Sequence, residues 1–128
     1  MSISSKVIFA LGSNTDRVRN INKAKEIVNE LFENVIYSRQ MLTIPIGIHS
    51  EDFLNCIGLA YTTQEYSNIR LALKDIEQLC GDEKSKRAYG TVNLDIDILQ
   101  FGEKRMHETD WERPYITELM KDIEVYIK

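Results

Sequence analysis

The sequence has few of the residues whose abundance would define a special class of protein. It contains two cysteines and two prolines in 128 residues, and it shows no internal repeat or low-complexity tract. Cys56 and Cys80 lie in apolar-periodic segments without the spacing of a metal or redox motif, so we expect buried, reduced thiols. Fibrous proteins and disulfide-framework proteins are therefore excluded.

The chain also lacks an excess of positive charge and any long apolar run. Its formal net charge is -4, so an extended nucleic-acid surface is not expected, and an anionic substrate would need a local basic cluster or metal ions. The apolar run near the N-terminus covers only about five residues, too short for a signal-peptide core or a membrane span. We therefore expect a cytoplasmic protein that binds neither nucleic acid nor membrane.

The remaining composition is that of an ordinary globular domain. Hydrophobic residues make up 43% of the chain and charged residues 28%. A chain of this length can build one proper core but not two, so we predict a single domain over residues 1–128.

Hydrophobic periodicity predicts elements in the order βαββαβ. We expect strands at 7–11, 34–44, 53–63 and 91–99, and helices at 16–32, 65–80 and 115–123. The short loop at 45–51 would pair the second and third strands antiparallel. This order predicts an α+β sandwich, in which a mostly antiparallel sheet carries two helices on one face.

The last predicted strand contains two aspartates in alternate positions. Alternation places Asp95 and Asp97 on one face and apolar side chains on the other. Two carboxylates about 6.5 to 7 Å apart on one strand face repel each other unless a cation lies nearby. One interpretation is a site for a hard cation such as Mg²⁺, which takes carboxylate, water and phosphate oxygens. The other is an edge strand whose acids face water and discourage strand pairing.

Three further features admit both a functional and a structural interpretation. Gly12-Ser13-Asn14 joins a strand to a helix, where backbone N–H groups could receive an anion or merely form the turn. Asn55 shares a strand face with Phe53 and Ile57, so its amide is either satisfied by neighbours or available to a polar ligand. Glu77 is an acid near a helix C-terminus, which indicates a partner or a solvated boundary residue.

A charged connector, residues 82–90, leads from the second helix to the aspartates. We expect it to be irregular, and it carries three cations, Lys84, Lys86 and Arg87. It is either a mobile flap over anionic ligands or a solvated run of charge.

Taken in order, these features resemble the 6-hydroxymethyl-7,8-dihydropterin pyrophosphokinase family of folate biosynthesis, over residues 5–120. The features are Leu11-Gly12-Ser13-Asn14, Asp52-Phe53-Leu54-Asn55, Glu77, Gly90 and Leu94-Asp95-Ile96-Asp97-Ile98. The resemblance implies a ferredoxin-like sandwich. It also implies Mg²⁺-dependent transfer of the pyrophosphoryl group of ATP to the hydroxymethyl oxygen of a reduced pterin, with release of AMP.

The same resemblance implies residue roles. Asp95 and Asp97 would be catalytic residues that hold two Mg²⁺ ions. Asn55 would hydrogen-bond the pterin edge and Phe53 would adjoin it, while Thr43 to Ile46 matches the segment whose backbone contacts the pterin. The residues implied at the nucleotide are Glu77, Lys84, Lys86 and Arg87.

The chain departs from the family pattern in the flap. Asp82, Ala88 and Val92 stand where the family has arginines. Lysine lacks the bidentate fork that binds phosphate oxygens, and lost cations beside a transferring phosphoryl group cost several kcal/mol of transition-state stabilisation. Tyr89 and Tyr115 replace a tryptophan and a histidine, and the C-terminal part is shorter than is typical.

These departures leave two rival interpretations open. One is a non-catalytic paralogue that binds a pterin or a nucleotide. The other is a ferredoxin-like interaction domain whose acidic strand faces solvent. Trp111 and the strand edges are compatible with a monomer or a weak homodimer.

Overall fold

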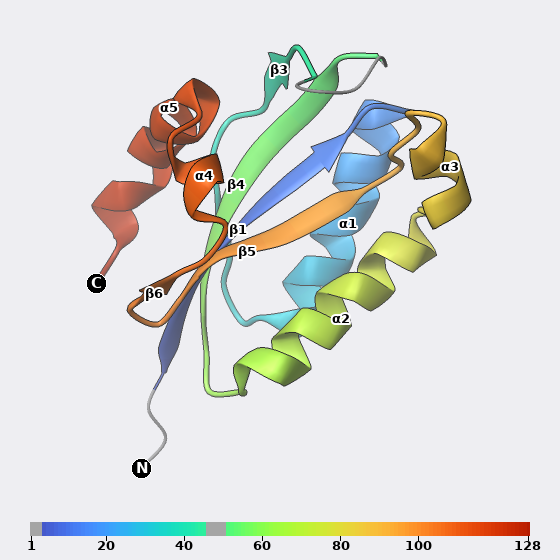
Figure 1. The fold of residues 1–128 in the computed structure, drawn as a ribbon. Coiled ribbons are helices and arrows are strands. Elements are labelled where there is room, and N and C mark those ends of the chain that lie inside the picture. Colours follow the sequence, from blue (N-terminus) through green and yellow to red (C-terminus); the bar gives the residue numbers. More distant parts are fainter. Residues whose placement is uncertain (1–3, 46–50) are drawn as a thin grey trace.

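A computed structural model describes residues 4–45 and 51–128 (Figure 1). Ile46, expected in the pterin segment, lies outside the described residues. The strands are β1 (Ser5–Ser13), β2 (Ile36–Tyr37), β3 (Met41–Thr43), β4 (Phe53–Thr62), β5 (Asp95–Phe101) and β6 (Lys104–Arg105). The helices are α1 (Arg17–Leu31), α2 (Tyr66–Leu79), α3 (Lys84–Ala88), α4 (Glu108–Trp111), α5 (Pro114–Ile123) and the 3-10 helix η1 (Glu124–Tyr126).

The strands form one antiparallel sheet in the order β2-β4-β1-β5-β6, with β3 also paired to β4. The central strand β1 therefore lies between the strand that carries Asn55 and the strand that carries Asp95 and Asp97. The register places Gly12 opposite both Asn55 and Asp95. The predicted α+β fold is confirmed, and it is consistent with a ferredoxin-like sandwich.

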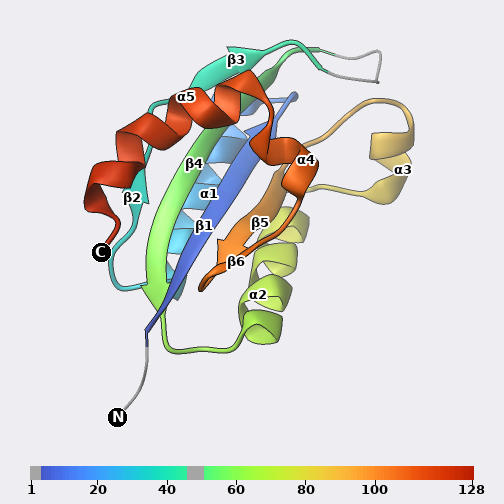
Figure 2. The same cartoon turned by 60° about the vertical axis from the view of Figure 1, so that its left-hand side comes forward.

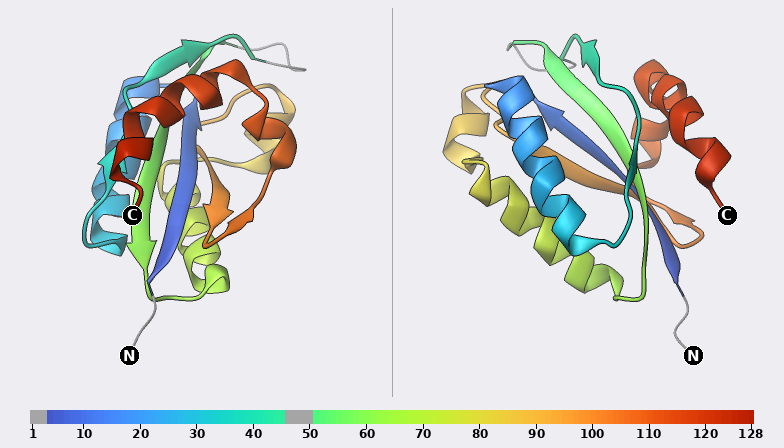
Figure 3. Two further views of the ribbon diagram at one scale, coloured as in Figure 1. Left: turned by 90° about the vertical axis from the view of Figure 1, so that its left-hand side faces the viewer. Right: turned by 180° about the vertical axis from the view of Figure 1, so that it is seen from behind.

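Helices cover both faces of the sheet (Figures 2 and 3). The helices α1 and α2 lie on one face, and α4 and α5 lie on the other (Figure 1). The core beneath α1 and α2 includes the buried residues Phe9, Ile21, Val28, Leu73, Leu94 and Ile96. The core on the α5 face includes Ile8, Ile57, Leu99, Ile116 and Leu119.

The predicted alternation along β5 is confirmed by these two cores. Ile96 and Ile98 lie in the α1–α2 core, whereas Leu99 lies in the α5 core. Leu99 is also the extra residue of a β-bulge, since Ile8 pairs with Gln100 and the next residue, Phe9, pairs with Ile98.

The three predicted helices are confirmed with small shifts at their ends. Gly81 follows α2 with a φ of 85°, the left-handed conformation that glycine adopts without a steric penalty just past a helix. The helix α1 begins after Asp16, which has no side-chain capping hydrogen bond.

The prediction of one long strand over 34–44 is wrong, because the ladder is interrupted between β2 and β3. Ser38 donates its N–H to the Ile57 carbonyl at 2.8 Å, and its Oγ accepts the Ile57 N–H at 2.8 Å. The hydroxyl thus takes the place of a backbone carbonyl. Arg39 then points toward α5, where it pairs with Glu118 and Asp122.

Two other boundaries differ from the prediction. The connector at 82–90 is not wholly irregular, because it contains the short helix α3. The strand predicted at 91–99 is β5 at Asp95–Phe101 instead. Val92 exchanges hydrogen bonds with Asn14 rather than with a strand, so regular pairing with β1 begins only where Asp95 meets Gly12.

The cysteine prediction is confirmed, since Cys56 and Cys80 are both buried and free. Burial raises the pKa of each thiol above its ordinary value. Within the described parts of the chain, no helix is both long enough and apolar enough to cross a membrane.

Candidate active site

A cavity of about 240 Å³ lies at the end of the sheet where β3, the end of β1 and the start of β5 come together. It is lined by Gly12, Thr43, Ile44, Pro45, Phe53, Asn55, Asp95, Asp97, Asp110, Arg113 and Tyr115, among others. Four strands, β1, β3, β4 and β5, and the segment from α4 to the start of α5 therefore contribute to one site. The predicted pterin residues Thr43, Phe53 and Asn55 share this cavity with the aspartate pair.

Asn55 is buried with only 7% of its surface exposed, and its amide nitrogen is occupied. Nδ2 donates to Thr43 Oγ1 at 2.7 Å, with longer contacts to the carbonyls of Met41 and Phe53 at 3.4 Å. No donor among the described residues reaches its carbonyl oxygen. The amide is thus oriented by neutral hydrogen bonds, and within the described residues its carbonyl oxygen is available to accept from a ligand.

Gly12 allows this close arrangement of β1 and β4. A Cβ at this position would lie 3.2 Å from Asn55 Oδ1 and 3.6 Å from the Phe53 ring. A larger residue would therefore press on the oxygen atom that the cavity offers.

Asp95 and Asp97 lie on the same face of β5, as the alternation predicts, and both line the cavity. Burial and the neighbouring carboxylate of Asp95 raise the pKa of Asp97 to about 8, with smaller contributions from Asp110 and Glu77. Only part of each residue is exposed. The interpretation in which both acids simply face water is therefore not supported for Asp97.

The donor chemistry of this pair fits a divalent cation. Two carboxylates that disfavour each other's charge gain most from a shared cation, and carboxylates are the ligands that Mg²⁺ prefers. Among residues 4–45 and 51–128, no group of three or more His, Cys, Asp or Glu side chains is arranged to hold a metal ion. A cation bound here would therefore complete its coordination with water or phosphate oxygens.

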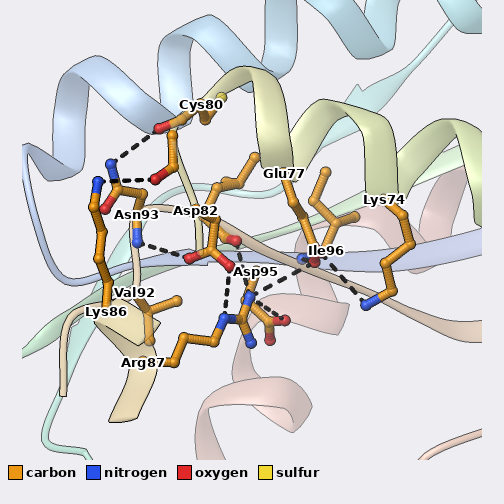
Figure 4. Close-up of polar contacts among 12 residues, drawn as sticks. Lys74, Glu77, Cys80, Asp82, Lys86, Arg87, Val92, Asn93, Asp95 and Ile96 are labelled. Carbon is orange, nitrogen blue, oxygen red and sulfur yellow. Dashed lines mark hydrogen bonds and ion pairs between the residues drawn. The ribbon is translucent and has the colours of Figure 1, made fainter. Parts of the chain in front are cut away.

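Glu77 is buried behind the start of β5, and the structure contradicts a solvated position. Its Oε2 accepts the Ile96 N–H at 2.8 Å, and its Oε1 lies 3.4 Å from Lys74 Nζ (Figure 4). Burial raises the pKa of the carboxyl, although the hydrogen bond from Ile96 opposes that rise. The acid at the end of α2 thus does have a partner, which is the backbone of the aspartate strand.

The three flap cations occupy different positions. Arg87 and Lys84 line a groove between α2 and α3 that also contains Glu77. Arg87 Nη2 donates to Asp95 Oδ1 at 3.3 Å, whereas Lys86, which is not among the residues that line the groove, donates to the Gly81 carbonyl at 3.0 Å (Figure 4). Two of the three cations therefore face the same groove as Glu77.

The Gly-Ser-Asn turn connects β1 to the base of the flap. Asn14 Nδ2 donates to the Gly90 carbonyl at 2.7 Å, and its Oδ1 accepts the Val92 N–H at 2.7 Å. This cross-link explains why an asparagine ends the turn, and it favours the structural interpretation of that residue. Val92 is only 7% exposed.

Sequence reasoning missed four charged residues around the aspartates. Arg113 and Asp110 line the first cavity and pair with each other at 3.2 Å. Arg70 and Lys74 line the groove with Glu77, and also a smaller cavity against Asp97 and Ile98. Arg70 and Lys74 are one helical turn apart, a spacing that indicates a shared face of α2 and could have identified them.

Comparisons with known proteins agree with this geometry. Residues 8–125 match the model of the 7,8-dihydro-6-hydroxymethylpterin-pyrophosphokinase family. The chain is 30% identical, over 92% of its length, to a folate synthesis bifunctional protein of Arabidopsis thaliana and to a mitochondrial one of Pisum sativum. It spans 27% and 25% of the length of these two relatives. The chain belongs to the 7,8-dihydro-6-hydroxymethylpterin-pyrophosphokinase family.

Proposed function

We propose that this protein transfers the pyrophosphoryl group of ATP to the hydroxymethyl oxygen of a reduced 6-hydroxymethylpterin, with Mg²⁺, and releases AMP. The observation that carries the proposal is the shared cavity. One hollow contains an oriented amide, Asn55, and a pair of carboxylates, Asp95 and Asp97. A pterin bound at the amide would thus place its hydroxymethyl group in the same cavity as the two carboxylates.

The pterin half of the cavity supports recognition by hydrogen bonds. A pterin edge presents N–H donors, and the carbonyl oxygen of Asn55 is an acceptor. Because this oxygen is buried, a ligand that offered it no donor would bind with a free-energy penalty. Thr43 fixes the amide, and Phe53 offers an aromatic face beside it. The backbone from Thr43 to Pro45 would complete this half.

Asp95 and Asp97 would hold the metal ions. When bound, Mg²⁺ would neutralise charge on the phosphates and align the hydroxyl with the β-phosphorus. The contribution of the chain is to present two carboxylates on one rigid strand, with the side chain of Asp97 largely removed from water. Because Asp97 must lose its proton to bind a cation, metal affinity should increase as the pH rises toward 8.

The groove beside α2 is our candidate for the nucleotide phosphates. It contains Glu77, Lys84 and Arg87, with Arg70 and Lys74 on the facing helix. Lys86 would have to leave the Gly81 carbonyl to reach an anion there. These cations are a source of positive charge in a flap that lacks arginine at positions 82, 88 and 92.

A non-catalytic paralogue that binds a pterin or a nucleotide is the second candidate. It is favoured by the burial of Val92 and by the engagement of Arg87 with carboxylates, which together leave few cations fixed for transition-state charge.

The two candidates separate in one set of measurements. Calorimetric titration with a non-hydrolysable ATP analogue and Mg²⁺ should show binding to the native chain and little binding to Asp97→Ala. AMP should then form when ATP and 6-hydroxymethyl-7,8-dihydropterin are supplied together. Binding without AMP formation would leave the non-catalytic paralogue. No binding by either chain would exclude the kinase and any paralogue that binds a nucleotide.

A further inference from the structure

The side chain of Arg87 donates three hydrogen bonds between α3 and the start of β5, and its Nη2 also lies 3.9 Å from Glu77 Oε2. Nε donates to Asp82 Oδ2 at 2.6 Å, and Nη2 donates to the Leu94 carbonyl at 3.0 Å and to Asp95 Oδ1 at 3.3 Å (Figure 4). A planar guanidinium with several fixed contacts has already lost most of its rotational freedom. It is therefore a preorganised cation rather than a mobile surface charge.

Asp82 uses both carboxylate oxygens to create this arrangement. Oδ2 pairs with Arg87, and Oδ1 accepts the Asn93 N–H at 3.1 Å, while only 8% of the side chain is exposed. A carboxylate this buried needs a partner for each oxygen. Because Asn93 lies two residues before Asp95, the same side chain anchors Arg87 and the approach to the aspartate strand.

Among the described residues, Arg87 forms an ion pair with Asp95. Its Nη2 contacts Oδ1 of a carboxylate proposed to bind metal, and 32% of that side chain is exposed. A metal ion and the guanidinium would compete for this oxygen. If the metal displaced Nη2, the bond from Nε to Asp82 would keep the guanidinium close by, beside the arriving phosphates.

We propose that Asp82 is a positioning residue, which holds Arg87 against Asp95 before ligands bind and keeps the guanidinium at that place for the phosphates afterwards. This inference rests on the proposed function. Asp82 would act by holding Arg87 in place. Arg87 would compete with a metal ion for Asp95 when no nucleotide is bound, and it would contact the phosphates when the metal–nucleotide complex binds.

The first test is Arg87→Ala, studied by titration with two probes. Mn²⁺ alone should bind about threefold more tightly than to the native chain, because a competing cation is gone. The non-hydrolysable ATP analogue with Mg²⁺ should bind roughly tenfold more weakly, because a charge-assisted contact to phosphate is lost. A purely structural role for Arg87 would weaken both.

The second test is Asp82→Asn, which keeps the shape and an oxygen acceptor for Asn93. Affinity for the ATP analogue should fall about threefold in the native background and not further in Arg87→Ala, which a double-mutant cycle measures. Asp75→Asn is the matched control, since it makes the same change at an exposed acid of α2 that does not line the groove. Thermal unfolding and pterin binding report on folding in each variant.

The outcomes distinguish this inference from the function beneath it. If the native chain binds neither probe, the proposed function fails and this inference fails with it. If the native chain binds both, the inference alone is overturned by weaker Mn²⁺ binding to Arg87→Ala. It is equally overturned if the effects of Asp82→Asn and Arg87→Ala on analogue affinity are additive.

Discussion

The two halves of the candidate site are held together by different kinds of interaction. In the pterin half, Asn55 is oriented by neutral hydrogen bonds to Thr43 and to backbone carbonyls. In the nucleotide half, charged groups satisfy one another, as Arg87 does with Asp82 and Asp95. A neutral scaffold can keep its contacts when a ligand arrives, whereas paired charges must exchange partners. We therefore expect the first half to be preformed and the second to rearrange.

The largest effect should come from removing one of the paired aspartates. In Asp97→Ala, AMP formation from ATP and 6-hydroxymethyl-7,8-dihydropterin should fall by roughly 10²- to 10³-fold, as expected when one preorganised electrostatic group is lost. Pterin binding without nucleotide should persist, because Asn55 and Thr43 are unchanged. Asp75→Ala, which removes an exposed acid of α2, is the control. Loss of pterin binding in Asp97→Ala would show that the two halves are not independent.

Glu77 tests whether the charged half also supports the fold. Glu77→Ala leaves the buried Ile96 N–H without its acceptor, so the free energy of unfolding should fall by about 1–3 kcal/mol. Glu77→Gln retains an oxygen acceptor and should recover most of that loss in thermal unfolding. Nucleotide titration of the glutamine variant then separates the roles, since native affinity in that variant would argue against a contact between Glu77 and the nucleotide.

Gly12→Ala should damage the pterin half selectively. The added methyl group would lie 3.2 Å from Asn55 Oδ1, so the amide must shift by a few tenths of an ångström. We expect pterin affinity to fall about tenfold, equivalent to about 1.4 kcal/mol. Affinity for the ATP analogue, measured on the same sample, should stay within about twofold of native. Equal losses for both ligands would contradict a division between the halves.

The last prediction concerns the cost of the aspartate pair to the stability of the folded chain. The pKa of Asp97 is raised from 3.8 to about 8 on folding, so the folded state loses stability as the pH rises through that window. Asp97→Asn removes this loss. In the presence of a chelator, the variant should match the native chain near pH 4 and unfold on the order of ten degrees higher near pH 8. A difference that does not change with pH would exclude ionisation as its cause.

Local patterns in the sequence were enough to predict the sheet, the main helices and one shared face for the two aspartates. Each of these depends on periodicity within a single segment, as in β5 and α2. The interruption at Ser38 was not predictable in this way. It depends on a hydroxyl that meets the backbone of Ile57 across the sheet, and nothing near position 38 in the sequence indicates that partner.

The same distinction applies to the site. The chemical type of Asn55, Asp95 and Asp97 is visible in the sequence, but the partners of charged residues are not. From the sequence alone, Asp82 is only a position where the family's arginine is absent. The structure shows that it pairs with Arg87, five residues later on the short helix α3. Arg113 likewise gains significance only because the segment before α5 returns to the cavity.

The bulge at Leu99 allows the two ends of β5 to meet separate requirements. Strict alternation would turn Phe101 toward the same side as Asp97, yet its ring packs edge-on against Tyr66 at the start of α2, at 5.6 Å. The extra residue reverses the alternation of side chains between the carboxylates and the hairpin that leads into β6. A change of one residue in the hairpin beyond the bulge would therefore leave Asp95 and Asp97 facing the same side of β5.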